Sequence, residues 1–304
     1  MLNMVPGAIE LGFLYALMSM GVYITFRILN FPDLTVDGSF TTGASIAAVM
    51  MINGYAPWSS SLAAFIGGLA AGACTGILHT KGKINGLLSG ILMMIALYSI
   101  NLRIMGQPNT SLRGSDTLFA DISPLIMMPI FVLVIKLLLD LFLHSDFGLA
   151  LRATGDNPLM IKSLGVNTDH TKIFGVSLSN GLVVLSGAMI AQQSGFADIS
   201  MGIGMIVIGL ASVIIGEAIF GAGTVFRATL AVILGSIIYR IVVAIALRVE
   251  WFDASDLKVI TALIVIVALV LPTLQRKMAQ KKAAQKRSQE LLISSRELGV
   301  DGDR

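Results

Sequence analysis

Long apolar runs separated by short polar connections are the feature of this sequence that most constrains its fold. A helix needs about 20 apolar residues to cross the roughly 30 Å hydrocarbon core of a bilayer. Only 13% of the 304 residues are charged, whereas soluble domains carry about 25%. The runs are 7–27, 38–55, 59–79, 84–105, 123–143, 173–193, 202–220, 228–247 and 256–274. We therefore predict an all-α, polytopic transmembrane helical bundle of about nine spans, with eight or ten as alternatives.

One run, 38–55, is short and rich in Gly, Ser and Thr, so a broken or partly re-entrant helix is an alternative there. The run 59–79 instead places small residues on one helical face, at every fourth position. These residues are Ala64, Gly68, Gly72 and Gly76. Such a face lets helices approach closely in a membrane, and we favour packing within the chain over a dimer seam.

The distribution of Lys and Arg predicts the orientation of the bundle, because cytoplasmic loops of membrane proteins are enriched in both. No Lys or Arg precedes Arg27, and most of the others lie in 81–83, 152–172 and the C-terminal tail. An odd number of crossings then places the N-terminus outside and the tail inside. We divide the chain into a transmembrane domain, 1–274, and a basic cytoplasmic tail, 275–304.

Composition also limits the partners and cofactors to be expected. The basic tail lacks interleaved aromatic residues, so we expect it to set topology or to contact lipid or a partner protein, with no nucleic acid bound. A single cysteine, Cys74, excludes a disulfide framework. The three histidines lack the spacing of a metal site. We therefore expect this chain to lie in a lipid bilayer and to bind no metal.

The inward-facing stretch 146–172 does not read as a simple connector. Asn157 and Pro158 are typical of a helix N-cap and first helical residue, and Gly165 is typical of a helix stop. We expect Gly155 and Gly165 to let the chain turn tightly at either end of this short helix. Its apolar residues are Leu159, Met160, Ile161 and Leu164. An exposed apolar face of this kind needs a partner surface.

A resemblance to a known family lies in the same stretch. The run Gly-Leu-Ala-Leu-Arg-Ala-Thr-Gly-Asp-Asn-Pro, 148–158, followed by Ser-Leu-Gly-Val-Asn-Thr, 163–168, resembles the inner loop of permeases in the branched-chain amino-acid and simple-sugar ABC importer superfamily. The resemblance extends to Asn-Phe-Pro-Asp-Leu-Thr-Val-Asp-Gly-Ser at 30–39 and to the segment 209–221. These two signatures are most similar to an uncharacterised bacterial branch often associated with tryptophan or tyrosine uptake.

In that family the inner loop forms a coupling helix that docks on an ATPase subunit. By resemblance, the coupling residues here are Gly155, Asp156, Asn157, Pro158, Leu159, Met160, Ile161, Leu164 and Gly165. The family also implies a second permease copy, an extracellular or periplasmic solute-binding protein and a place in the bacterial plasma membrane. The sequence has no G-x-x-x-x-G-K-[ST] phosphate loop, so ATP and Mg are expected on the partner subunit. We expect no cofactor bound by this chain and no enzyme activity of its own.

Polar residues inside the predicted spans are candidates for a translocation path or gate, because ionisable groups at membrane depth usually face protein or water. The candidates are Asp37, Asn101, Asn180, Gln192, Glu217 and Arg240. Structural roles compete with this interpretation: a helix cap for Asp37, interhelical hydrogen bonds for the amides, and a pair between Glu217 and Arg240. Lys136 and Asp140, four residues apart, are expected to form a local helix pair.

Three classes of function fit an apolar chain of this kind. A membrane-embedded enzyme would need a motif such as H-E-x-x-H or G-x-S-x-G, and the sequence contains neither. An ion-coupled secondary transporter of a small polar solute is the alternative, although it would usually carry more mid-span carboxylates. We expect this chain to be the permease subunit of an ATP-driven importer. The expected solute is a small molecule, namely an amino acid, and in the narrower prediction an aromatic amino acid.

Overall fold

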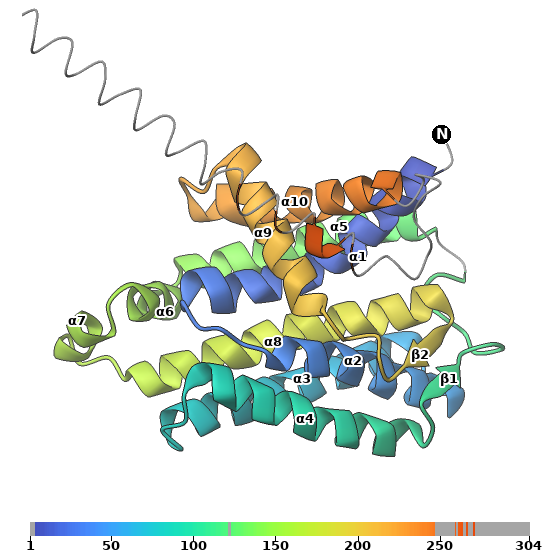
Figure 1. Cartoon of the computed structure of the whole chain (residues 1–304), viewed down its shortest axis with the longest axis horizontal. Coiled ribbons are helices and arrows are strands. Elements are labelled where there is room, and N and C mark those ends of the chain that lie inside the picture. Colours follow the sequence, from blue (N-terminus) through green and yellow to red (C-terminus); the bar gives the residue numbers. More distant parts are fainter. Residues whose placement is uncertain are drawn as a thin grey trace, which may run out of the picture.

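The computed structural model describes residues 4–120 and 123–246, together with 259, 261–263, 266 and 270. These residues form a helical bundle with one small two-stranded sheet (Figure 1). The elements are α1 (Met4–Val22), η1 (Tyr23–Ile28), α2 (Thr35–Ile52), α3 (Pro57–Thr80), α4 (Gly86–Met105), β1 (Asn109–Ser111), α5 (Pro124–His144), α6 (Asp146–Asp156), α7 (Pro158–Ser163), α8 (Thr168–Ser194), β2 (Phe196–Asp198), α9 (Met205–Phe220) and α10 (Val225–Ala246).

Eight of the nine predicted spans coincide with helices of this bundle. Six of these helices are long and apolar enough to cross a membrane, counting α1 with η1 as one. The other two are α2, which is rich in small polar residues, and α9, which has 16 residues. The predicted span 256–274 and the basic tail 275–304 lie mostly or wholly outside the described residues.

The segment predicted as a weak or broken span is one continuous helix, so the broken-helix alternative is wrong. Thirteen of the 18 residues of α2, among them every Ser and Thr, are buried by neighbouring helices, so these hydroxyl groups do not face lipid. Its backbone lies directly against α8. A Cβ on Gly43 would come within 1.9 Å of the Val184 carbonyl oxygen, and one on Gly187 within 2.0 Å of the Phe40 carbonyl oxygen.

The small-residue face of α3 packs against the same central helix. A Cβ on Gly72 would lie 2.4 Å from the carbonyl oxygen of Val176, and one on Gly76 would lie 2.7 Å from the Cα of Ile173. The preference for packing within the chain over a dimer seam is therefore confirmed for this face. In lipid no hydrophobic effect drives helices together, and the close approach of their backbones provides van der Waals packing in its place.

The two ends of the bundle differ in what they carry. The helices α6 and α7 extend from one end, and the strands lie at the other (Figure 1). β1 and β2 pair antiparallel, with Thr110 opposite Ala197. Hydrogen bonding by Ser200, chiefly through its hydroxyl, lowers the pKa of the Asp198 carboxyl at this end. The sheet joins the segment that follows α4 to the segment that follows α8, and the linker 199–204 then leads back into the bundle to α9.

Candidate functional site

Two aspartates of the stretch 30–39 cap the starts of two different helices inside the bundle. Asp33 accepts a hydrogen bond from the backbone N–H of Thr35 at the start of α2, at 2.9 Å. Asp37 accepts from the N–H groups of Gly204 at 2.9 Å and Ile206 at 2.8 Å, at the start of α9. The expectation that Asp37 caps its own helix is thus wrong.

The reason lies in the path of the linker 199–204. It runs so close to α2 that a Cβ on Gly202 would come within 1.9 Å of the Asp37 carbonyl oxygen. At this short separation the Asp37 carboxylate binds the backbone amides at the start of α9 and not those at the start of its own helix. Gly204, with φ +88°, makes the turn into α9, which explains why that helix begins later than the predicted residue 202.

Asn180 lies in a buried polar network that joins α8 to the start of α2. Its Nδ2 donates to Asp33 Oδ2 at 2.7 Å, and its Oδ1 accepts from the Ser39 hydroxyl at 2.7 Å. All three side chains are buried. The amide of Asn180 therefore serves an interhelical hydrogen-bond network, which is the structural alternative named for it above.

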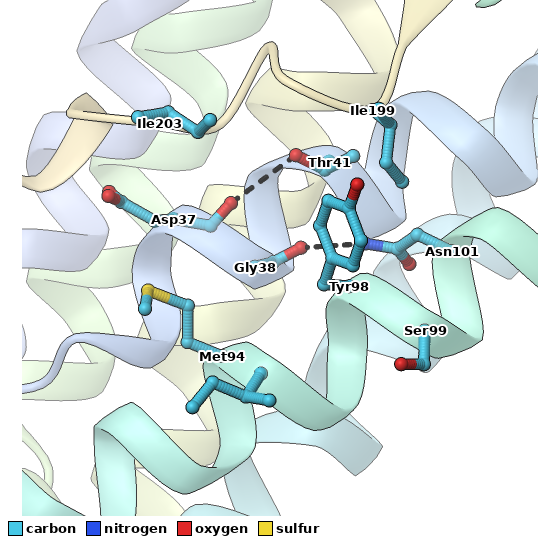
Figure 2. Close-up of a pocket in the computed structure, with 10 residues that line it drawn as sticks. Asp37, Gly38, Thr41, Met94, Tyr98, Ser99, Asn101, Ile199 and Ile203 are labelled. Atoms are coloured by element: carbon cyan, nitrogen blue, oxygen red, sulfur yellow. Dashed lines mark hydrogen bonds between the residues drawn. The ribbon is translucent and has the colours of Figure 1, made fainter. Parts of the chain in front are cut away.

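A cavity of about 490 Å³ opens beside this network, between α2, α4 and the linker 199–204 (Figure 2). Most of its lining is apolar. Asn101 joins two of its walls, because its Nδ2 donates to the Gly38 carbonyl oxygen at 3.1 Å. The lining residues are Asp37, Gly38, Thr41, Met94, Ile95, Tyr98, Ser99, Asn101, Ile199 and Ile203. Two of the six predicted path residues, Asp37 and Asn101, therefore share this cavity.

Gln192 does not belong to that cavity. Its Nε2 donates to the Ser61 hydroxyl at 2.9 Å, and its Oε1 accepts from the backbone N–H of Leu118 at 3.2 Å. The side chain thus holds α8 to α3 and to the connection that precedes α5. Its observed contacts are structural.

Glu217 and Arg240 do not pair with each other, so that expectation is wrong. Glu217 forms an ion pair with Arg27 at 3.0 Å, while the Arg240 guanidinium stacks over the Tyr15 ring, 3.5 Å from its centroid. α9 ends and α10 begins at the same end of the bundle. Gly216, next to Glu217, packs against Ala231 and Gly235 of α10, so Arg240 lies further along α10 than the level of Glu217.

Lys136 and Asp140 form the expected local pair along α5, and both side chains are buried. Two further contacts were not predicted from the sequence. Asp140 also accepts a hydrogen bond from the Thr229 hydroxyl of α10 at 2.7 Å. The Lys136 ammonium lies 3.4 Å above the centre of the Phe226 ring. The charge pair therefore fastens α5 to α10.

The helix α7 has the caps that the sequence predicts. Asn157 Oδ1 accepts from the Met160 N–H at 3.0 Å, Pro158 is the first helical residue and Gly165 has φ +87°. Leu159, Met160 and Leu164 are 80%, 61% and 66% exposed. Ile161 differs from them, because it is buried against the rest of this chain.

The preceding helix α6 was not predicted from the sequence, because 146–156 contains no long apolar run. Gly155 lies within it and does not make a turn, contrary to the expectation. A Cβ at this position would come within 1.8 Å of the Ile28 carbonyl oxygen. Gly155 is therefore the contact point between α6 and the π-helical turn η1, and no larger residue fits there.

Comparison with known proteins gives the class of the chain. A family model described as "Branched-chain amino acid transport system / permease component" matches residues 6–270. The tyrosine transport system permease protein of Clostridioides difficile (strain R20291) is 49% identical over 252 residues, or 83% of this chain and 85% of that protein. The autoinducer 2 import system permease protein of Salmonella typhi is 30% identical over 264 residues, 83% and 73% of the two chains.

A solved structure of a metal-chelate type ABC transporter in an inward-facing conformation has the same fold. It covers 90% of this chain and 85% of its own, with a TM-score of 0.50 and 16% identity. The chain belongs to the branched-chain amino-acid transport permease family. It is a multi-pass permease subunit of a bacterial ABC importer, and so a transport subunit and not an enzyme. The ion-coupled alternative is set aside by this membership.

The buried pair of α5 makes a stability prediction. Replacing Lys136 by Met leaves the Asp140 carboxylate without its counter-charge, which costs about 3–5 kcal/mol in buried pairs. The double variant Lys136→Met with Asp140→Leu removes both charges and should recover most of that loss. Thermal unfolding of the purified chain in detergent measures both. A double variant less stable than the single one would contradict this account.

Proposed function

We propose that this permease carries an aromatic amino acid, tyrosine in the first instance, into the cell. The observation that supports it is the 49% identity, over 83% of the chain, to a tyrosine transport system permease. The more distant relative named for autoinducer 2 import is only 30% identical. The sequence signatures at 30–39 and 209–221 favour the same solute class by resemblance.

We further propose that the working importer contains a second copy of this chain, a separate ATPase that binds ATP and Mg, and a solute-binding protein. Membership in a permease family supports a separate energy source, because the sequence has no phosphate loop of its own. Selection of the solute outside the cell would then fall first to the binding protein.

Transport as proposed has a direct test. Cells without their own aromatic amino-acid uptake, given this chain with its neighbouring ATPase and binding-protein genes, should accumulate labelled tyrosine. Excess unlabelled tyrosine should compete, and leucine should not. Replacing the phosphate-loop lysine of the ATPase should abolish uptake. Leucine competing as well as tyrosine, or uptake that survives the ATPase variant, would overturn the proposal.

The coupling helix in this proposal is α7, with Asp156 and Asn157 at its start. Leu159, Met160 and Leu164 project from the end of the bundle with most of their apolar surface uncovered. Large exposed apolar residues outside the bilayer indicate a protein partner, and the ATPase is the partner that the family implies. Ile161 anchors the helix to its own chain and does not belong to the docking face.

This division of α7 predicts different failures on its two faces. Met160→Asp would bury a charge in the contact and should lower ATPase recovery and tyrosine uptake by about tenfold or more, as at an interface hot spot. The folded permease should be recovered in normal amount. Met160→Leu is the matched control and should transport normally. Ile161→Asp should instead reduce the amount of folded permease. Normal assembly of Met160→Asp would rule out α7 as the coupling element.

The orientation that we propose places α6 and α7 in the cytoplasm and the β1–β2 sheet outside. The connection between α3 and α4, which carries Lys81 and Lys83, lies at the end from which α6 and α7 extend (Figure 1), and this basic end is expected to stay inside.

Single cysteines test this orientation. In a Cys74→Ser background, Asn53→Cys after α2 should react with a membrane-impermeant maleimide added to intact cells. Lys81→Cys after α3 should react only in inside-out vesicles, because the charge bias holds it inside. Reaction of both cysteines from one side would refute the crossing between them, and the reverse pattern would refute the orientation.

A further inference from the structure

The walls of the cavity between α2, α4 and the linker 199–204 are fixed by hydrogen bonds. The linker and the first turn of α9 are bound to α2 by three backbone N–H groups. Gly202 donates to the Thr41 hydroxyl at 3.1 Å, and Gly204 and Ile206 donate to the Asp37 carboxylate. On the other side, Asn101 of α4 donates to the Gly38 carbonyl oxygen. A cavity whose walls are already in place needs little ordering to receive a ligand.

The cavity combines one charged group with an apolar wall. Among the described residues that line it, Asp37 carries the charge, and its side chain is partly exposed. Backbone N–H groups of Gly204, Met205 and Ile206 bind the carboxylate, whose two oxygens together offer about four lone-pair positions. A carboxylate at this depth has to face protein or water and not lipid. The Asp37 carboxylate is therefore the group that would pair with an ammonium group in the cavity.

The opposite wall suits an aromatic or large apolar side chain. Met94 and Tyr98 of α4 face Ile203 of the linker across the cavity, and the Tyr98 phenol points toward the side where Thr41 lies (Figure 2). Tyr98 and Ile203 are more than half exposed. The volume of about 490 Å³ is within the range of about 300–1,000 Å³ for small-molecule sites.

We propose that this cavity is a transient binding site for the amino acid in transit, with Asp37 meeting its ammonium group and Tyr98 and Ile203 holding its side chain. The inference rests on the proposed function and adds a second selection step inside the permease. Asn101 is a positioning residue, since it holds α4 against α2 and so sets the width of the cavity. Binding is weak, because a solute on a transport path has to leave as readily as it enters.

Protection from alkylation tests the site directly. Ile203→Cys, in a Cys74→Ser background, is assembled with its ATPase in nanodiscs and treated with a small maleimide. With a Kd of about 1 mM, L-tyrosine at about 2 mM should slow alkylation about threefold. L-alanine lacks the ring and 3-(4-hydroxyphenyl)propionate lacks the ammonium, so neither should protect. Asn53→Cys after α2 is the control, because this position is exposed and lies apart from the cavity lining, and it should react at the same rate with every compound.

Each other outcome counts against the site. Equal alkylation with and without tyrosine, or a cysteine at position 203 that does not react at all, would overturn the proposal. Protection by 3-(4-hydroxyphenyl)propionate equal to that by tyrosine would show that Asp37 does not bind the ammonium group in this site. Tyr98→Cys replaces Ile203→Cys if the latter does not fold. Tyrosine uptake by the unmodified importer is measured in parallel. Uptake of tyrosine without protection from alkylation would overturn only the proposed binding site. Absence of tyrosine uptake would overturn the proposed function.

Discussion

Backbone amides at a helix start have no partner within the helix, and in a membrane they cannot be left to water. This constraint explains the interior of the bundle, where α2 and α9 both begin. Asp33 satisfies the start of α2 and Asp37 that of α9. Each charge is in turn stabilised by the positive end of the helix dipole that it caps. The position of the linker 199–204, and with it the cavity, depends on the second of these carboxylates.

The central packing follows from the same need to keep polar groups inside protein. α8 has glycines and small polar residues where α2 and α3 cross it, so the backbones meet closely and Asn180 reaches the buried Asp33. Substituting a larger residue at Gly43 or Gly187 would move α2 away from α8 and break that bond. Close packing and the polar network are therefore one arrangement, and α2 needs no apolar surface for lipid.

Much of this fold could be predicted from the sequence, because hydropathy, caps and small-residue spacing are local signals. The described spans, the Asn157 cap of α7 and the face of Gly72 and Gly76 all followed from such signals. Contacts that depend on how distant segments return to one another did not. No pattern at 30–39 shows that Asp37 caps a helix about 170 residues later in the chain, and the pairing of Glu217 with Arg27 equally depends on the fold. The cavity is missed for the same reason, since its walls come from three separate segments.

The helix starts also lie in mechanical contact with the proposed docking end. α6 touches the carbonyl oxygen of Ile28 through Gly155, at the end of the π-helical turn η1, and π-helical turns often occur at functional sites. From η1 the chain runs directly to Asp33, while Arg27 of the same turn is paired with Glu217 at the far end of α9. A displacement of α7 by an ATPase would act on η1 first. It would reach both ends of α9 from there, through the ion pair at one end and through the stretch from Asp33 to Asp37 at the other. The cavity lies beside the second of these contacts, so its width would change with the same movement.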